Sequence, residues 1–247
     1  MLRVNHLTYK FASRIILDDI SAEFPKDKIT VIVGPNGCGK STLLSFLSRD
    51  KVAQGKIFLQ GSDVNSLSPK DYARKVAILP QQRDIMADFY VKDVVVMGRF
   101  PYKEKFRDYT AEDRYKAQMA MEQVGIDTMA ERRISHLSGG EIQRVMIAKN
   151  LSQTAPIILM DEPTNHLDVK YKLALMKIMR AYKGTVVMVL HDLSLAMEYS
   201  DRVILMKQGK IIRQGKTKDV LEPSLLADVF DAPFVRYEHE GRIYLNY

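Results

Sequence analysis

Four short runs of consecutive apolar residues, rich in β-branched side chains, lie along the chain at 29–33, 76–79, 157–160 and 185–190. Such unbroken runs are typical of parallel strands that are buried on both faces. Helix-like stretches separate the runs, so the pattern predicts an α/β fold with a mostly parallel sheet. A polar or glycine-rich group follows each run. Because ligands in such folds bind at the carboxyl ends of the strands, we expect the functional groups to meet there.

Four further stretches predict strands at the edges of this core: 2–11, 22–24, 56–59 and 202–207. The last of them is followed by Gln208-Gly209 and then by a β-like stretch at 210–213. Glycine permits the positive φ of a tight turn, so these segments predict an antiparallel hairpin. The sequence therefore predicts a small antiparallel β subdomain beside the parallel sheet.

The β pattern disappears at 85–151, where stretches at 91–100 and 111–124 are helix-like. In the second stretch, helical spacing predicts an apolar face formed by Met119, Ala120, Gln123 and Val124. We therefore predict that 85–151 is an inserted α-helical subdomain. The α/β core would consist of 1–84 and 152–247, together with the antiparallel subdomain and a C-terminal tail.

The tail has a weaker pattern than the core. It predicts short helices at 219–221 and 224–230, followed by a hairpin over 234–247. The turn of that hairpin is expected at Glu240-Gly241, because glycine accepts the left-handed backbone of tight turns.

The composition is that of a globular chain. Of 247 residues, 46% are hydrophobic and 27% are charged, which excludes a disordered or collagen-like protein. Cys38 is the single cysteine, so no internal disulfide forms and a reducing compartment is expected. The N-terminus lacks the pattern of a signal peptide, and no apolar run reaches the roughly 20 residues of a spanning helix. We therefore expect a soluble chain that, if it works at a membrane, is held there by a partner.

The net charge is +7, from 37 lysines and arginines against 30 acidic residues. Positive charge can indicate nucleic acid or anionic lipid as a partner. Basic and acidic residues alternate along most of the chain, however, and no run of five basic residues occurs. The pattern favours a moderately basic protein with phosphate ligands and no nucleic-acid partner.

The segment after the first apolar run matches the phosphate-loop pattern G-x-x-x-x-G-K-[ST]. The residues predicted to bind the nucleotide are Gly34, Pro35, Asn36, Gly37, Cys38, Gly39, Lys40, Ser41 and Thr42. Glycines let successive backbone N–H groups turn towards phosphate oxygens, and the N-terminus of the following helix adds partial positive charge. We expect Lys40 to reach the β- and γ-phosphates and Ser41 to ligate Mg²⁺.

The third apolar run ends in two carboxylates, Asp161 and Glu162. Side chains alternate along a strand, so we expect the two to point in different directions and to serve different roles. Asp161 is predicted to hold Mg²⁺, and Glu162 is predicted to act as the general base that polarises the attacking water. A solvated acidic turn before Pro163 is the alternative.

Ser138 and Glu141 have the spacing of a capping box, and a helix is predicted at 145–151. Between them lie Gly139 and Gly140, which a capping box does not require and which weaken a helix. Close approach of the backbone to an anion would explain both glycines. The chain thus has a second helix N-terminus suited to phosphate but one phosphate loop. This indicates that the second phosphate belongs to another copy of the chain.

These motifs, in this order, resemble those of the ATP-binding-cassette (ABC) transporter ATPases, nearly from end to end. The resemblance adds Gln81 after the second apolar run, Asp168 in the D-loop and His191 after the fourth run. It implies two cassettes that face head to tail. Each ATP would then lie between the phosphate loop of one copy and the signature segment 138–141 of the other.

The resemblance also implies roles for single residues. Phe11 fills the position whose aromatic ring stacks on adenine, with an ordinary core aromatic as the alternative. Gln81 would contact Mg²⁺ and couple the site to the membrane partner, with a surface loop as the alternative. His191 would hold the γ-phosphate and order the attacking water.

Three stretches, 97–102, 161–168 and 190–193, are similar to those of cassettes that import ferric siderophores, haem and cobalamin. A simpler interpretation of the first is a helix end, capped by Gly98 and broken at Pro101. The resemblance implies a homodimeric importer ATPase on the cytoplasmic face of the plasma membrane. Its partners would be permease subunits and, indirectly, a substrate-binding protein, and its cofactors would be ATP and Mg²⁺.

Three other classes of protein share parts of this pattern. Soluble ABC ATPases that act on ribosomes usually join two cassettes in one chain, whereas this chain has one phosphate loop. DNA-repair and chromosome ATPases interrupt the cassette with coiled coils or zinc modules, for which the span between Lys40 and Asp161 has no room. A nucleotide-gated scaffold would not need both Glu162 and His191, which favour hydrolysis.

Three residue types yield further predictions. Cys38 lies among backbone donors that lower a thiol pKa, which predicts a reactive cysteine; a small residue that fits the loop is the alternative. Methionines are predicted to fill gaps in the core, for example Met119, Met121, Met176 and Met179. The five histidines are dispersed, so no metal cluster is expected among them.

Overall fold

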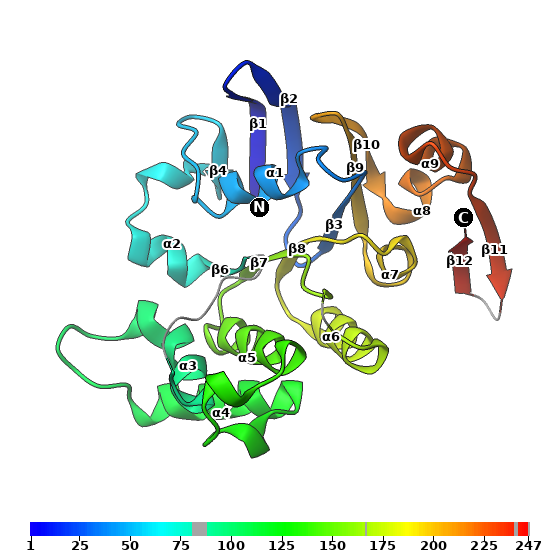
Figure 1. The fold of residues 1–247 in the computed structure, drawn as a ribbon. Coiled ribbons are helices and arrows are strands. Elements are labelled where there is room, and N and C mark those ends of the chain that lie inside the picture. The colour runs from blue at the N-terminus through cyan, green and yellow to red at the C-terminus, as the bar shows by residue number, and fades with distance from the viewer. Residues whose placement is uncertain (81–87, 166, 240–241, 247) are drawn as a thin grey trace. The chain divides into compact units, whose positions relative to one another are not determined.

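A computed structural model describes residues 1–80, 88–165, 167–239 and 242–246 of the chain (Figure 1). The chain forms two compact units. Unit 1 consists of Met1–Leu67 and Lys183–Tyr247, and unit 2 consists of Ser68–Tyr182. Unit 2 thus includes the predicted helical insert together with flanking strands. The boundaries predicted for the insert itself stay predictions.

Unit 1 contains a set of buried parallel strands. β3 (Ile29–Val33) lies between β8 (Thr185–Val189) and β9 (Arg202–Lys207) and pairs parallel with both. All residues of β3 and β8 are buried, as their unbroken apolar runs predict. The hairpin of β9 with β10 (Lys210–Lys216) is confirmed, but its assignment to the small antiparallel sheet was wrong. The four central residues of β9 are buried and belong to the parallel set, which β10 extends at one edge.

The antiparallel subdomain is a separate sheet with the strand order β2-β1-β4-β5. Its strands are β1 (Leu2–Phe11), β2 (Arg14–Phe24), β4 (Ile57–Leu59) and β5 (Ser62–Asp63). β2 begins at Arg14, earlier than the predicted 22–24. The sequence pattern missed this part of the strand because Asp18 and Asp19 interrupt its apolar residues. Asp19 has a φ of 53°, and the register between β1 and β2 shifts beside it, which is typical of a bulge.

Unit 1 also contains short helices and a C-terminal hairpin. The helices are α1 (Lys40–Leu47), η1 (Val64–Ser66), α7 (Leu193–Tyr199), α8 (Thr217–Val220) and α9 (Pro223–Phe230). The predicted hairpin is confirmed, since β11 (Val235–His239) pairs antiparallel with β12 (Arg242–Asn246). The residues predicted to form its turn, Glu240 and Gly241, lie outside the described residues.

Unit 2 contains two parallel strands, β6 (Val76–Leu79) and β7 (Ile157–Asp161), with Val76 opposite Ile157. Its helices are α2 (Pro69–Lys75), α3 (Val91–Val96), η2 (Met97–Tyr102), α4 (Ala111–Val124), η3 (Asp127–Met129), η4 (Ile134–His136), α5 (Gly139–Ser152) and α6 (Val169–Ala181). In the part of the chain that the structure describes, no helix has the length and apolar character to cross a membrane.

Helix α4 has the predicted bounds, but the predicted apolar face was wrong. Its buried apolar residues are Ala117, Ala120 and Met121, whereas Met119 is 46% exposed. The observed spacing of i, i+3 and i+4 is the usual one for a helix with one buried face. Met119 is therefore not a core residue, although the other three methionines named above are buried.

Helix η2 packs closely on α5 through Gly98 and Arg99. A Cβ atom on Gly98 would lie 2.1 Å from the Lys149 carbonyl oxygen, so this glycine permits close packing and is not a helix cap. Arg99 is 4% exposed, and its Nε donates a hydrogen bond of 2.9 Å to Asp113 Oδ1. Its Nη1 donates a second one, of 3.0 Å, to the Ser152 carbonyl oxygen. Arg99 thus joins η2, α4 and α5 inside unit 2.

Candidate functional site

The phosphate-loop residues lie in unit 1 between β3 and α1, which confirms the predicted order of strand, loop and helix. Three loop glycines have a positive φ: 151° at Gly34, 74° at Gly37 and 104° at Gly39. A Cβ atom would lie 2.1 Å from the Met206 carbonyl oxygen at Gly34, and 2.8 Å from Leu17 Cδ2 at Gly39. Packing against β9 and β2 therefore requires these two glycines, in addition to the turn itself.

The N-terminus of α1 is not capped by a side chain. Its N-cap residue, Gly39, has a left-handed backbone and makes no side-chain hydrogen bond. The first N–H groups of a helix lack partners within the helix and carry partial positive charge. Together with the open turn of the loop, this end of α1 is suited to a phosphate group.

Lys40 lies buried in the same loop, with 5% of its surface exposed. Its Nζ donates hydrogen bonds to the carbonyl oxygens of Gly34 and Pro35, at 2.8 and 3.0 Å. The ammonium group is therefore held inside the loop by neutral acceptors. Because a phosphate oxygen is charged and accepts a stronger hydrogen bond than a carbonyl oxygen, it competes well for this group.

Cys38 is also buried, with 4% of its surface exposed. Burial raises the pKa of its thiol, and the positive charge of Lys40 and backbone hydrogen bonds offset this rise only in part. The backbone donors do lower this pKa, as predicted, but the cost of removing the thiolate from water outweighs them, so the net shift is upward. The structure favours the alternative, a small side chain that fits the loop.

Phe11 is the last residue of β1, and 68% of its surface is exposed. This exposure contradicts the alternative that Phe11 is an ordinary core aromatic. An exposed aromatic ring can stack on a planar base. The stacking of Phe11 on adenine stays a prediction.

The two carboxylates of unit 2 lie on either side of a strand end. Asp161 is the last residue of β7 and is 8% exposed. Glu162 has a φ of 48°, which is uncommon for a residue other than glycine and is found at functional sites. Since Glu162 lies beyond the strand, this turn sets its direction, and the predicted alternation along a strand does not apply to it.

Asn165 orients the Glu162 carboxylate. Its Nδ2 donates a hydrogen bond of 2.6 Å to Glu162 Oε2. The backbone closes the same turn, since the Asn165 N–H donates to the Glu162 carbonyl oxygen at 3.1 Å. No pattern in the sequence predicts a separate role for Asn165. Pro163 marks a turn, but the contact across it depends on the backbone conformation of Glu162.

The signature segment forms the predicted capping box at the start of α5. Ser138 Oγ accepts a hydrogen bond from the Glu141 N–H at 3.4 Å, and Glu141 Oε2 accepts one from the Ser138 N–H at 2.7 Å. Hydrogen bonding from the Ser138 backbone lowers the pKa of the Glu141 carboxyl. The helix begins at Gly139, directly after the Ser138 cap and earlier than the predicted 145. Both glycines therefore lie in its first turn.

Packing within the chain does not require Gly139. Among the described residues, no neighbouring atom outside the helix backbone lies within 4 Å of the position of a Gly139 Cβ. Ser138 and Gly139 are both exposed. The glycine therefore leaves open space above the first turn of α5, which is the condition for close approach of another group.

The remaining predicted residues are distributed over both units. Asp168 is the N-cap of α6, and its Oδ1 accepts a hydrogen bond of 3.0 Å from the Tyr171 N–H. His191 follows β8, is exposed, and lines a cavity of about 690 Å³ beside Phe230 of α9. Gln81 lies outside the described residues.

Of the three residues predicted to ligate a metal, the structure describes two: the Ser41 hydroxyl in the first turn of α1 and the Asp161 carboxylate. Over the described ranges, no three His, Cys, Asp or Glu side chains gather into a metal site made of protein alone. One hydroxyl and one carboxylate fit Mg²⁺, which prefers oxygen and usually takes waters and phosphate oxygens as its other ligands. Each donor, one in unit 1 and one in unit 2, is thus of the type that Mg²⁺ takes together with a nucleotide.

Comparison with known proteins agrees with these features. Residues 17–165 match the ABC transporter family. The chain is 38% identical to an achromobactin transport ATP-binding protein of Dickeya dadantii, over 91% of this chain and 86% of the relative. It is also 38% identical to an iron(3+)-hydroxamate import ATP-binding protein of Bacillus subtilis, over 93% and 87% of the two chains. The same identity, over 96% and 82%, relates it to a hemin import ATP-binding protein of Rhodococcus jostii.

Solved structures share the fold. An inward-facing transporter described as of the metal-chelate type has a TM-score of 0.83 over 99% of this chain and 95% of that chain, at 22% identity. A dimeric ATP-binding cassette with ADP and phosphate bound has a TM-score of 0.75 over 88% and 99%, at 26% identity. The α/β ATPase fold with a β subdomain and a helical insert is thereby confirmed. The chain belongs to the ABC transporter family, as an ATP-binding subunit.

Proposed function

We propose that this chain is the ATP-hydrolysing subunit of an ABC importer for a ferric siderophore or a related haem or cobalamin chelate. The observation that carries the proposal is the nearly full-length similarity, at 38% identity, to ATP-binding proteins of achromobactin, iron(3+)-hydroxamate and hemin transport. The site's chemistry supports hydrolysis, because a phosphate loop occurs together with a carboxylate that Asn165 orients.

Nucleotide binding in this proposal depends mainly on unit 1. Lys40 and the N–H groups of the phosphate loop bind the ATP phosphates, and the exposed ring of Phe11 stacks on adenine. Ser41, Asp161 and Gln81 would hold Mg²⁺, which, when bound, neutralises the charge of the β- and γ-phosphates. The uncapped N-terminus of α1 and the buried Lys40 ammonium support this assignment.

Hydrolysis in this proposal depends on Glu162 and His191. The oxygen of a water molecule bonds to the γ-phosphorus, and the bond from that phosphorus to the leaving ADP oxygen breaks. Glu162 accepts the proton that the attacking water loses. His191 holds the γ-phosphate and orders the water. The left-handed backbone at Glu162 and the hydrogen bond from Asn165 support a fixed position for the base.

We propose that two copies face head to tail, so that the 138–141 segment of one copy meets the ATP held by the other. Asp168 would lie in the D-loop at the same interface. The exposed, unobstructed first turn of α5 supports such a contact. The dimeric structure of the related ADP-bound cassette supports it as well.

The remaining partners are permease subunits in the plasma membrane, which would hold this chain on the cytoplasmic face, and indirectly a substrate-binding protein. The similarity to an inward-facing transporter structure is consistent with the fold that this role requires. An ABC ATPase that acts on ribosomes or DNA is the alternative. The transport names of the three relatives favour the importer.

The test of this function uses the chain together with the permease subunits that co-purify with it, reconstituted in vesicles. We expect Glu162→Gln to lower ATP turnover by about 10²- to 10⁴-fold, while ATP binding changes less than about threefold. The variant should accumulate as an ATP-bound dimer on a sizing column. Glu104→Gln, at an exposed ion pair with Arg107, is the matched control and should leave turnover unchanged. Turnover of Glu162→Gln at the parental rate would overturn the mechanism.

The cargo needs a separate measurement. ATP-dependent uptake of a ferric hydroxamate siderophore, hemin and cobalamin is measured in the same vesicles, with the substrate-binding protein supplied. Uptake of at least one chelate that stops in Glu162→Gln supports the importer. Vesicles that hydrolyse ATP but take up none of the three would contradict the proposed cargo class.

A further inference from the structure

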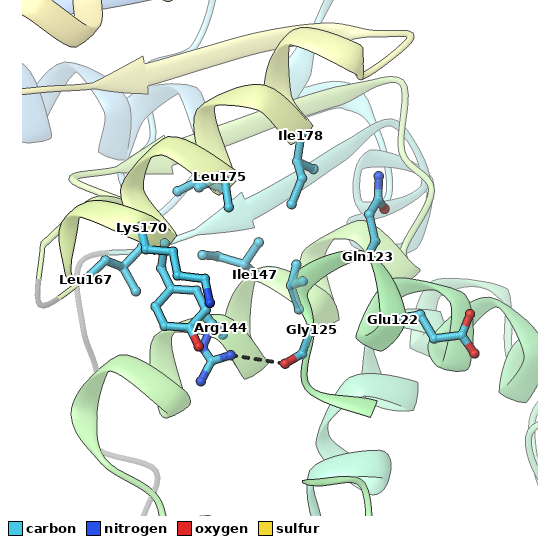
Figure 2. Close-up of a pocket in the computed structure, with 12 residues that line it drawn as sticks. Glu122, Gln123, Gly125, Arg144, Ile147, Leu167, Lys170, Leu175 and Ile178 are labelled. Atoms are coloured by element: carbon cyan, nitrogen blue, oxygen red, sulfur yellow. Dashed lines mark hydrogen bonds between the residues drawn. The ribbon is translucent and has the colours of Figure 1, made fainter. Parts of the chain in front are cut away.

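A cavity of about 360 Å³ lies within unit 2, between the C-terminal end of α4 and the helices α5 and α6 (Figure 2). Figure 2 shows Leu175 and Ile178 of α6 on the side of the cavity opposite Ile147 of α5. These three side chains form an apolar lining. The volume is within the range of sites that bind small molecules. The nucleotide site described above uses none of these residues.

Arg144 of α5 lies at one end of this cavity and is 7% exposed. Its Nη1 donates a hydrogen bond of 3.1 Å to the Gly125 carbonyl oxygen, and its guanidinium carbon lies 3.9 Å from the centre of the Tyr171 ring. Among the described residues, its Nε has no hydrogen-bond partner, but less than 1 Å² of this atom is exposed, so an occupant of the cavity does not reach it.

The charges around the cavity favour an anion. Lys170 of α6 also lines it and adds a second positive charge, with Nζ 5.6 Å from the Tyr171 ring centre. Glu122 is the acidic residue of the lining, but its carboxylate accepts a hydrogen bond of 2.9 Å from Gln118. Figure 2 shows that this carboxylate points away from Arg144. Arg144 therefore has no carboxylate of the lining as its partner.

We propose that this cavity binds a small amphipathic anion, with a carboxylate or phosphate-ester head on Arg144 and an apolar body between α5 and α6. The head would pair with the positive charge of the Arg144 guanidinium, which lines the cavity. The body would cover Ile147, Leu175 and Ile178. A planar guanidinium fork that is held by Tyr171 and Gly125 is well suited to either head group.

The place of the cavity connects it with ATP turnover, and this step rests on the proposed function. Arg144 lies on the helix that begins with the signature segment. Leu167, which also lines the cavity, precedes the Asp168 N-cap of α6. A ligand that contacts both helices would bias the arrangement of the signature turn and the D-loop. We therefore expect an occupant to change the rate of ATP hydrolysis.

The binding test titrates octanoate, octyl phosphate and neutral octanamide into the full chain without nucleotide, by calorimetry. We expect at least one of the two anions to bind about tenfold or more tightly than octanamide, because a charged acceptor on a buried guanidinium is worth at least a factor of ten. Binding of octyl phosphate alone would identify phosphate esters as the class, and binding of octanoate would identify carboxylates. Equal affinity for octanamide and both anions would overturn the proposal.

Variants locate the binding to this cavity. Arg144→Met removes the head-group contact, and Ala174→Phe fills the cavity from the exposed face of α6 without changing charge. Each should weaken anion binding by about tenfold or more. Lys177→Met, at an exposed position on the same helix, is the control and should change it less than twofold. Because Ala174→Phe leaves Arg144 intact, unchanged anion affinity in a folded Ala174→Phe chain would contradict the site even if Arg144→Met fails to fold.

A turnover assay separates this inference from the proposed function. ATP hydrolysis by the permease-bound parent chain is measured with and without a saturating concentration of the anion that binds. A change of at least twofold that Ala174→Phe abolishes supports regulation. An active enzyme whose rate is independent of the bound anion overturns the regulatory step. A chain that binds the anion but hydrolyses no ATP overturns the proposed function while the binding site stands.

Discussion

Two helices of this chain begin at segments that the sequence assigns to phosphate, and their N-termini differ in construction. α1 begins after Gly39, which offers no capping side chain, and the ammonium group of Lys40 is buried beside it. α5 begins after the exposed Ser138, whose side chain exchanges hydrogen bonds with Glu141. The first turn of α5 therefore has acceptors of its own, whereas that of α1 depends on another molecule to supply them.

The glycines of the two segments differ in the same way. Gly34 and Gly39 cannot take a Cβ atom, because Met206 and Leu17 of the same unit lie against them. Gly139 meets no such neighbour among the described residues. The phosphate loop is thus shaped by its own unit, whereas the signature turn leaves its space for a group from outside. This difference agrees with the proposal that the phosphate loop binds the chain's own ATP, whereas the signature turn contacts the ATP held by the other copy.

The largest expected effect concerns the buried cation at α1. Lys40→Ala removes the ammonium group that is held inside the loop, and we expect ATP affinity to fall about a hundredfold. Equilibrium binding of a fluorescent ATP analogue measures this loss. Lys26→Ala, at a highly exposed lysine of the same unit, is the control and should bind as the parent does. Affinity of Lys40→Ala within threefold of the parent would show that the loop does not hold the phosphates through this residue.

The next prediction compares the glycines directly. Gly39→Ala should lower the free energy of unfolding by about 1–3 kcal/mol, because its φ of 104° is strained for alanine and the new Cβ meets Leu17. Gly139→Ala should leave that free energy unchanged or raise it by up to about 1 kcal/mol, since alanine favours a helix. Urea unfolding measures both variants.

Stability and ATP turnover should not change together in Gly139→Ala. Gly139→Ala should lose at least tenfold in ATP turnover despite its stability, because the new methyl group fills the space that we assign to the nucleotide of the partner copy. Binding of ATP to its own phosphate loop should stay within threefold of the parent. A stable Gly139→Ala with parental turnover would remove the distinction between the two turns.

A smaller effect concerns the capping box. Ser138→Ala should cost about 1 kcal/mol in the free energy of unfolding. The pKa of Glu141 is lowered in the folded chain, so its contribution is present above the unfolded pKa and is lost as pH falls through the folded pKa. Ser138→Ala removes one donor to that carboxylate, and its stability should therefore fall less steeply with acidification below pH 5 than that of the parent. Ser224→Ala, exposed on α9, is the control and should keep the parental slope.

The smallest effect concerns the thiol of the loop. Burial raises the pKa of Cys38 above the ordinary value of 9.0, so its alkylation by iodoacetamide should be slow at pH 7 and should still accelerate at pH 9. MgATP should protect Cys38, since bound phosphates cover the loop. A rate that levels off below pH 8 would contradict the raised pKa. Equal rates with and without MgATP would contradict the position of the nucleotide.

Local patterns predicted much of the fold. The buried strands β3 and β8 and the bounds of α4 follow from the spacing of apolar residues, which neighbours in sequence determine. The prediction failed where a distant segment decides burial or pairing. β9 pairs with β3 far earlier in the chain, and Met119 is exposed because α4 turns its alanines inwards. Neither outcome has a local signal.

Residues of the candidate site, and Arg99 of unit 2, also differ in how far the sequence predicts their roles. The pattern of the phosphate loop, the Ser138 capping box and the contact of Asn165 with Glu162 each join residues within a few positions of each other. The left-handed backbone of Glu162, which sets the direction of its carboxylate, has no signal in the residue types. Arg99 binds Asp113 of α4 and the Ser152 carbonyl oxygen of α5, so its structural role could not be predicted from the stretch 97–102 alone.

By itself, the order of motifs in the sequence determined the family, the parallel-strand core and the residues expected to contact ATP, because each motif is a short stretch whose chemistry is local. Tertiary structure alone decided which glycines are required by packing, why the pKa of Cys38 rises, and that Arg144 and Lys170 line a cavity together with apolar side chains. These properties depend on removal of groups from water and on contacts over a few ångströms between segments that are far apart in the chain.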